Sequence, residues 1–158
     1  MEPKPSSASA VTMAQIVLPS QANAAGNMHG GEVMKLMDIA AGVVAQRHSH
    51  CNVVTASVDQ LTFQEPIFVG DLVICHAEIV YTGRTSMEVL VTVQVENLSR
   101  GEIKDALKGY FVMVALDRNG RPTPVPPLKL ENEEQKRRFE EGRQRVAALK
   151  KAARNSAS

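Results

Sequence analysis

Residues 23–48 decide the fold, and they read NAAGNMHGGEVMKLMDIAAGVVAQRH. Three glycines, Gly26, Gly30 and Gly31, permit tight backbone turns immediately before an apolar segment. From Gly31 to His48 the apolar residues cover most of a helix circumference, so the sequence predicts a largely buried helix. The N-terminus of that helix presents free N–H groups near Gly30 and Gly31, which favour developing negative charge.

Length and composition fit one globular domain. The 158 residues are 44% hydrophobic, which is enough for a single core. A net charge of +1 provides no field that attracts nucleic acid or an anionic membrane. No segment approaches the ~20 apolar residues needed to span a bilayer. We therefore expect a cytoplasmic protein without nucleic-acid binding or membrane insertion, in which Cys51 and Cys75 stay reduced.

After the helix, the hydrophobic period changes from 3.6 to 2. Between Thr85 and Glu96 apolar and polar residues alternate, as is typical of a half-buried antiparallel strand. Four further strands are predicted, bounded by Gly, Pro and Asp turns, at 11–18, 53–63, 72–82 and 106–116. A curled antiparallel sheet is the simplest way to bury one apolar helix, so the predicted class is α+β.

The two ends of the chain differ in composition from its middle. Residues 1–10 are rich in Ser, Pro and Ala and are expected to be mobile. Residues 129–158 contain nine Lys or Arg and five Asp or Glu, a charge of +4. Within them, 131–151 predicts a charged helix on the surface or against a neighbouring subunit. Residues 11–128 form the predicted folded domain.

Several common catalytic motifs are absent from the sequence. No two of the four histidines stand at i, i+4 on one helix with a third ligand nearby, which disfavours a metal site. There is no G-x-S-x-G, and neither cysteine belongs to a recognisable nucleophile–base motif. The glycine-rich signatures for ATP and NAD are also missing. Covalent serine or cysteine catalysis and nucleotide cofactors are therefore not expected.

Asp38 and Asn23 are candidate functional residues whose local pattern leaves two interpretations open. On a helical wheel Asp38 lies at the edge of a polar stripe, made by Glu32, Lys35, Gly42 and Gln46. This position fits a solvated carboxylate as well as a catalytic one. Asn23 begins an Asn-Ala-Ala-Gly segment, which is also an ordinary turn sequence.

One long segment resembles a known family. Residues 23–73, together with the Thr85-Ser86 turn and GRPTPVPPL at 120–128, resemble the hotdog-fold acyl-CoA thioesterases, particularly the cytosolic acyl-CoA hydrolases and their short bacterial relatives. The similarity covers roughly residues 13–145, including the charged stretch EEQKRRFEEGRQR. It implies a hotdog fold, in which a five-stranded antiparallel sheet wraps around the central helix, followed by a charged C-terminal helix.

The resemblance implies an enzyme that hydrolyses acyl-CoA to a fatty acid and CoA. Asp38 would be the general base, or less favourably the nucleophile, and Asn23 would orient the attacking water. The N–H groups near Gly30 and Gly31 would stabilise the oxyanion. No cofactor is implied, because CoA is part of the substrate and product. Candidate contacts to CoA are Val54, Thr55, Ser57, Arg84, Thr85, Ser86 and Lys108.

The resemblance also implies an oligomer. A homodimer would have two equivalent sites, each combining Asn23 of one subunit with Asp38 of the other, and three dimers would form a hexamer. Two other functions remain open at this point. One is a non-catalytic acyl-CoA sensor or carrier, which would bind without turnover. The other is a hotdog hydratase or dehydratase, which pairs His with Asp in a different motif; His29 is the nearest imidazole.

Overall fold

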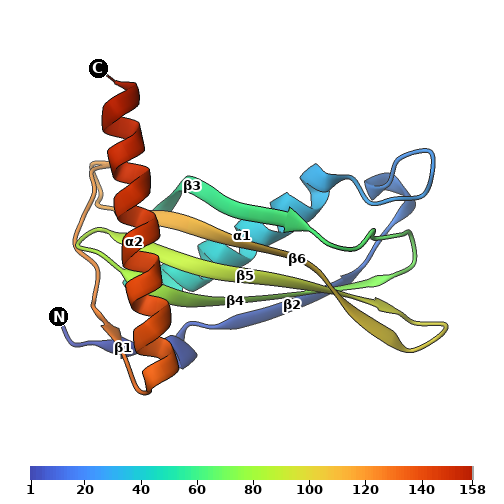
Figure 1. The fold of residues 1–158 in the computed structure, drawn as a ribbon, viewed down its shortest axis with the longest axis horizontal. Coiled ribbons are helices and arrows are strands. Elements are labelled where there is room, and N and C mark those ends of the chain that lie inside the picture. Colours follow the sequence, from blue (N-terminus) through green and yellow to red (C-terminus); the bar gives the residue numbers. More distant parts are fainter. Residues whose placement is uncertain (158) are drawn as a thin grey trace.

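The computed structural model describes residues 1–157 and has one long helix held inside a curved sheet (Figure 1). Its elements in chain order are β1 (Lys4–Pro5), η1 (Ser6–Ala8), β2 (Val11–Ile16), η2 (Pro19–Gln21), α1 (Gly30–Ser49), β3 (Asn52–Phe63), β4 (Leu72–Thr82), β5 (Ser86–Asn97), β6 (Glu102–Leu116), β7 (Leu128–Lys129) and α2 (Glu133–Ser156). The predicted α+β class is confirmed.

α1 buries one face and leaves the other open. Its buried apolar residues are Val33, Leu36, Met37, Ala40, Ala41, Val44 and Ala45. Full burial of a Val, Leu or Met side chain contributes about 1.5–3 kcal/mol, so this face accounts for much of the core energy. The helix ends where His50 turns into the left-handed conformation at φ 56° and donates its N–H to Gln46 O at 2.7 Å.

The five-stranded sheet has the order β2-β4-β5-β6-β3, and every neighbouring pair is antiparallel. On central β5, Met87, Val89, Val91 and Val93 face the core under α1. The prediction of a half-buried strand is wrong for residues 86–91, which are buried on both faces because α2 packs on the outer one. β6 begins at Glu102 instead of the predicted Ala106. Its first four residues are exposed on both faces, and they pair with the end of β5 beyond the part of the sheet that α1 covers.

The N-terminal residues make specific contacts. Lys4 and Pro5 pair in parallel with Leu128 and Lys129, and Lys4 Nζ donates to His48 O at 3.0 Å. The expected mobility of residues 1–10 stays a prediction, as do the boundaries at residues 10 and 128. Among residues 1–157, no helix is both long and apolar enough to cross a membrane.

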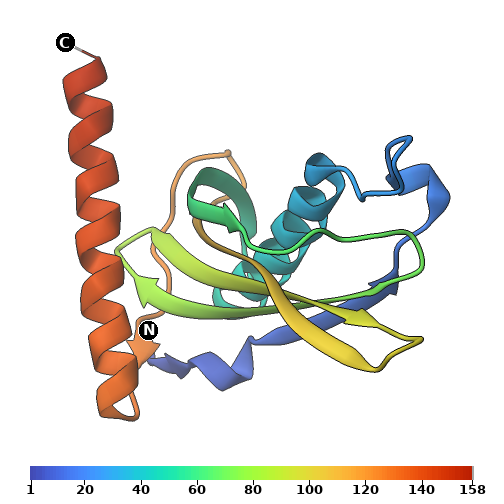
Figure 2. The ribbon, with the colours of Figure 1, turned by 45° about the vertical axis from the view of Figure 1, so that its right-hand side comes forward.

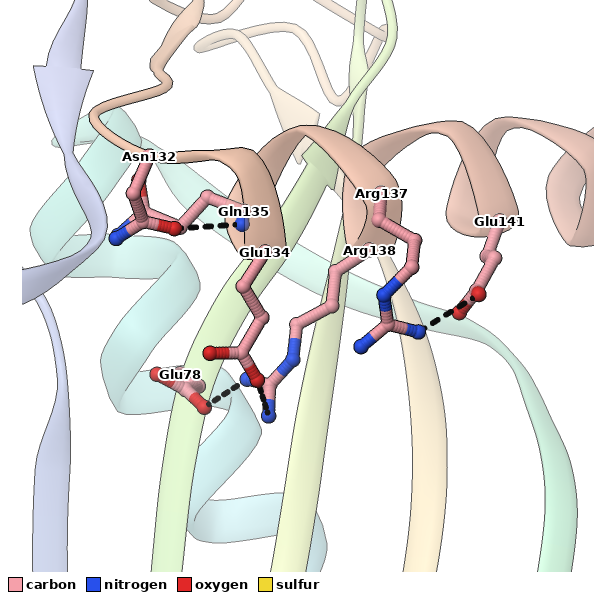
Figure 3. A network of polar contacts seen from close by, with 7 residues as sticks. All are labelled: Glu78, Asn132, Glu134, Gln135, Arg137, Arg138 and Glu141. Carbon is pink, nitrogen blue, oxygen red and sulfur yellow. Dashed lines mark hydrogen bonds and ion pairs between the residues drawn. The ribbon is translucent and has the colours of Figure 1, made fainter.

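α2 lies across the face of the sheet opposite α1, near one end of the strands (Figure 2). Its N-cap is Asn132, whose Oδ1 accepts the Gln135 N–H at 2.8 Å. In Figure 3, Arg138 reaches from the helix to Glu78 of β4 at 2.9 Å and also pairs with Glu134 at 3.2 Å. The charged helix predicted over 131–151 therefore exists, and in this chain it packs on its own sheet.

The strongest attachment of α2 is a buried ion pair. Glu88 of β5 is 0% exposed, and Arg145 donates to both of its oxygens, at 2.7 Å and 3.1 Å. The guanidinium also stacks 3.7 Å from the centre of the Tyr110 ring. Burial raises the pKa of Glu88, whereas the hydrogen bonds and charge of Arg145 act in the opposite direction. Gly142 lets the helix approach, since a Cβ there would lie 2.8 Å from Glu88 Oε1.

A second buried polar group lies at the end of α1. His48 is 1% exposed, and its Nε2 donates to the Pro126 carbonyl at 2.7 Å. In the neutral ring, Nδ1 is then the unprotonated nitrogen, and it is buried without a hydrogen-bond partner among residues 1–157. Burial, aided by the charges of Lys4 and His50, lowers the pKa of His48 even though the Pro126 bond opposes this.

Arg145→Met tests the buried pair. Removal of the guanidinium leaves Glu88 buried without its counter-ion, and we expect a loss of about 3–5 kcal/mol in unfolding free energy, measured by urea denaturation. Arg143→Met is the matched control, because Arg143 pairs with exposed Glu140 on the same helix. Its urea midpoint should match wild type, and an equal midpoint for Arg145→Met would contradict this account.

His48 makes stability depend on pH. Its folded pKa is lowered, so below about pH 6.5 the unfolded chain takes up a proton that the folded chain does not. Stability should therefore be fully present above pH 6.5 and fall as the pH drops. Between pH 7 and pH 5, the Tm of the His48→Gln variant should therefore fall by less than the Tm of wild type. Exposed His29→Gln is the control, because the His29 side chain makes no cap hydrogen bond, and it should retain the wild-type slope.

Candidate functional site

Asn23 organises the loop that leads into α1. Its Oδ1 accepts the N–H groups of Ala25 at 3.0 Å and Asn27 at 3.1 Å, and its own N–H donates to Asn27 O at 2.8 Å. Gly26 closes the turn at φ +86°, a conformation that strains residues with a side chain. Asn23 thus forms the turn that its local sequence permits. It is exposed, and its side-chain NH₂ has no acceptor among residues 1–157.

The start of α1 presents two free backbone donors. His29 is the N-cap residue and makes no side-chain cap, while its carbonyl accepts the N–H groups of Glu32 and Val33. The N–H groups of Gly30 and Gly31 have no acceptor within the described part of the chain. Nothing lies within 4 Å of a Cβ built on Gly31. Together with the helix dipole, these donors can stabilise an anionic oxygen.

Asp38 lies two turns further along α1 and has one specific partner. The Thr55 hydroxyl donates to Asp38 Oδ1 at 2.6 Å and lies 3.5 Å from Met113 Sδ of β6. Both Asp38 and Thr55 are exposed, on the face of the molecule where α1 and β3 are uncovered. Thr55 was expected from the sequence as a CoA contact. Its link to Asp38 depends on the register of β3 against α1, for which the sequence carries no signal.

The two halves of the candidate site are separated within one chain. Eight residues of helix place Asp38 about 12 Å from Gly30 along the axis, at ~1.5 Å per residue. No hydrogen bond joins Asn23 to Asp38 within residues 1–157. A single carbonyl group is too small to reach both the free N–H groups and the carboxylate of the same subunit.

Some of the predicted CoA contacts gather at one end of the sheet. Ser86 of β5 is opposite Val114 of β6, which is opposite Val54 of β3, so these residues follow one another across three strands. The turn before Ser86 is well anchored: the Thr85 carbonyl accepts the Ala115 N–H at 3.1 Å. Ser86 itself is buried, and its Oγ has no hydrogen-bond partner among the described residues.

Arg84, Ser57 and Lys108 occupy different surroundings. Arg84 is exposed, and its carbonyl accepts the Val125 N–H at 2.9 Å. Ser57 and Lys108 face away from α1, on the side of the sheet that holds Tyr110. Lys108 is also six residues from Val114, the β6 residue opposite Ser86. At ~3.3 Å per residue, this separation is about 20 Å along the strand. One subunit therefore does not bring Lys108 together with the 84–86 turn.

Comparison with known proteins agrees with this arrangement. Residues 25–101 match the family model of the thioesterase superfamily. The chain is 39% identical over 151 residues to the cytosolic acyl coenzyme A thioester hydrolase of Rattus norvegicus, and the match spans 94% of this chain but only 40% of that protein. It also matches a crystal structure of an apo-hexameric acyl-CoA thioesterase at 37% identity, over 97% of this chain and 98% of the other, with a TM-score of 0.90.

The chain belongs to the acyl-CoA thioester hydrolases of the thioesterase superfamily. A second family member, the acyl-CoA hydrolase of Staphylococcus aureus in complex with butyryl coenzyme A, coenzyme A and coenzyme A disulfide, has a TM-score of 0.88 and 32% identity, covering 98% of this chain and 94% of that one. The hotdog fold predicted from the sequence is thus confirmed.

Proposed function

We propose that this protein hydrolyses acyl-CoA to a free acid and CoA, with Asp38 as general base. The observation that carries the proposal is the short hydrogen bond from Thr55 to Asp38, in a family member that also presents free N–H groups at the start of α1. Water is the only co-reactant, so no cofactor is proposed. A cytoplasmic location is proposed from the composition, and the related Rattus norvegicus protein is named cytosolic.

The N–H groups of Gly30 and Gly31 bind the thioester oxygen. As water adds to the carbonyl carbon, that oxygen gains negative charge, and each aligned donor lowers the barrier by about 3 to 4 kcal/mol. Asp38 accepts the proton of the attacking water while Asn23 orients that water. Thr55 keeps the carboxylate in one orientation. Collapse of the tetrahedral intermediate then breaks the C–S bond and releases CoA as the thiolate.

A second copy of the chain completes the site. β3 is an edge strand of twelve residues with exposed Val54 and Val58, and the adjacent face of α1 exposes Met34 and Ile39. A long apolar edge of this kind favours pairing with an identical strand. Antiparallel pairing places the Asn52 end of one β3 beside the Phe63 end of the other. Asp38 and Thr55 of one subunit then approach the Asn23–Gly31 loop of its partner.

Known variants of a relative support the choice of residues. Structures of the Staphylococcus aureus enzyme exist with alanine in place of an asparagine, an aspartate or a threonine. In that protein the asparagine and the aspartate are 15 residues apart, and the aspartate and the threonine are 17 residues apart. Asn23, Asp38 and Thr55 have the same separations here. We extend the proposal to a trimer of dimers, because the related acyl-CoA thioesterase structure is hexameric.

Release of free thiol from acyl-CoA tests the activity. We expect wild type to turn over, and Asp38→Asn and Asn23→Ala to fold normally but lose about 10²-fold or more in kcat. Each variant removes one group that acts on the attacking water. Binding of acyl-CoA by wild type without any thiol release would replace the hydrolase with an acyl-CoA sensor or carrier.

Subunit mixing tests whether the sites are shared. A heterodimer of Asn23→Ala with Asp38→Asn subunits contains one site with both groups intact and one with neither. Unfolding and refolding the two inactive variants together at equal amounts should restore about a quarter of wild-type activity, because half of the dimers are mixed and each has one working site. The variants refolded separately are the control. Absence of recovery would mean that Asn23 and Asp38 act within one subunit or not at all.

Thr55→Val tests the partner of Asp38. The change keeps the β-branched shape but removes the hydroxyl that donates at 2.6 Å, and we expect kcat to fall about tenfold or more with a smaller change in KM. Thr55→Ser retains the donor and should recover most of the activity. Equal losses in both variants would assign Thr55 to packing or substrate contact instead of positioning.

A further inference from the structure

Phe63 places an exposed aromatic ring beside the free donors of α1. The ring is the last side chain of β3 and is 53% exposed. Its Cζ lies 3.5 Å, and its Cε1 4.0 Å, from the position of a Cβ built on Gly30. The ring therefore forms an apolar wall next to the unpaired N–H groups of Gly30 and Gly31.

A distortion of β3 puts the ring there. The register against β6 shifts between Asp59 and Thr62, and Gln60 has φ 55°, a left-handed conformation that is uncommon for a residue other than glycine. The Asp59 carboxylate supports this bend by accepting the Gln60 N–H at 2.9 Å. Strained bulges of this kind re-aim side chains and are frequent beside active sites.

The residue after the bulge, Leu61, packs into space left by a glycine of β6. Leu61 packs towards the core, and its Cδ1 would lie only 2.9 Å from a Cβ on Gly109 of β6. A larger residue at position 109 would force the Leu61 side chain to shift. Leu61 thus anchors the strand directly after Gln60, and Phe63, two residues later on the same face of the strand, lies against Gly30.

We propose that Phe63 contacts the first carbons of the acyl group and sets the preference for acyl chains longer than acetyl. This inference rests on the proposed function, in which the thioester oxygen binds the N–H groups of Gly30 and Gly31. The acyl group is bonded to the same carbonyl carbon, so its second and third carbons lie within reach of a ring beside those donors. An aromatic surface there replaces water around methylene groups, whereas it offers nothing to the phosphates of CoA.

Phe63→Ala and Phe63→Leu test the assignment with acetyl-, butyryl- and hexanoyl-CoA. We expect Phe63→Ala to lower the ratio of kcat/KM for hexanoyl-CoA over acetyl-CoA about tenfold, since about two methylene groups lose their apolar partner. Phe63→Leu should retain most of the ratio because an apolar side chain remains. Leu98→Ala is the control, as Leu98 is 51% exposed in the turn between β5 and β6. Its ratio should equal that of wild type.

The possible results separate this inference from the proposed function. A wild type that releases no thiol from any acyl-CoA overturns both. An active wild type whose Phe63→Ala variant loses the same factor for all three substrates overturns the inference alone, and would assign the ring to support of the helix start. Thermal melts identify any variant that fails to fold. If Phe63→Ala does so, Phe63→Gln takes its place, because it fills the position with a polar side chain: a ratio shifted towards acetyl-CoA supports the inference, and one equal to wild type rejects it.

Discussion

Burial of only one face of α1 is the constraint on which the rest of the molecule depends. The sheet curls around the helix and encloses its apolar residues, but five strands do not close around it. The opposite face, with Met34, Asp38 and Ile39, stays open. A helix in the middle of a closed barrel would bury Asp38 without water. The open face instead leaves the Asp38 carboxylate accessible to water. It also places the carboxylate beside β3, an edge strand that can pair with another chain.

The same geometry explains why the site is divided. Asp38 and the first residues of α1 lie on one rigid rod, so no bending of the chain can bring them together. In the proposed dimer, a two-fold axis beside β3 would set the start of one strand against the end of its copy. Each subunit would then supply a carboxylate to one site and the backbone donors to the other.

α2 performs a different task on the opposite side of the sheet. The outer face of β4, β5 and β6 contains Val80, Leu90 and Tyr110 as well as the fully buried Glu88. A charged helix suits this surface because it brings an apolar anchor, Val146, together with the arginine that neutralises Glu88. Loss of either feature would expose apolar area or leave a buried charge, so α2 belongs to the structural unit of this chain.

The sequence by itself determined the central helix, the five main strands and the fold class, and it provided the residues of the candidate site through the family resemblance. Periods of 3.6 and 2 are local properties, and the glycine-rich entry to α1 is a local motif, so both can be read from neighbouring residues. Burial of Glu88, in contrast, could not be predicted from its alternating strand, because it depends on Arg145, 57 residues later. Strand register and packing likewise produce the Thr55–Asp38 hydrogen bond, the bulge at Gln60 and the contact of Phe63 with Gly30. Only the tertiary structure decided them, because each joins residues whose separation in sequence carries no information about their distance in space.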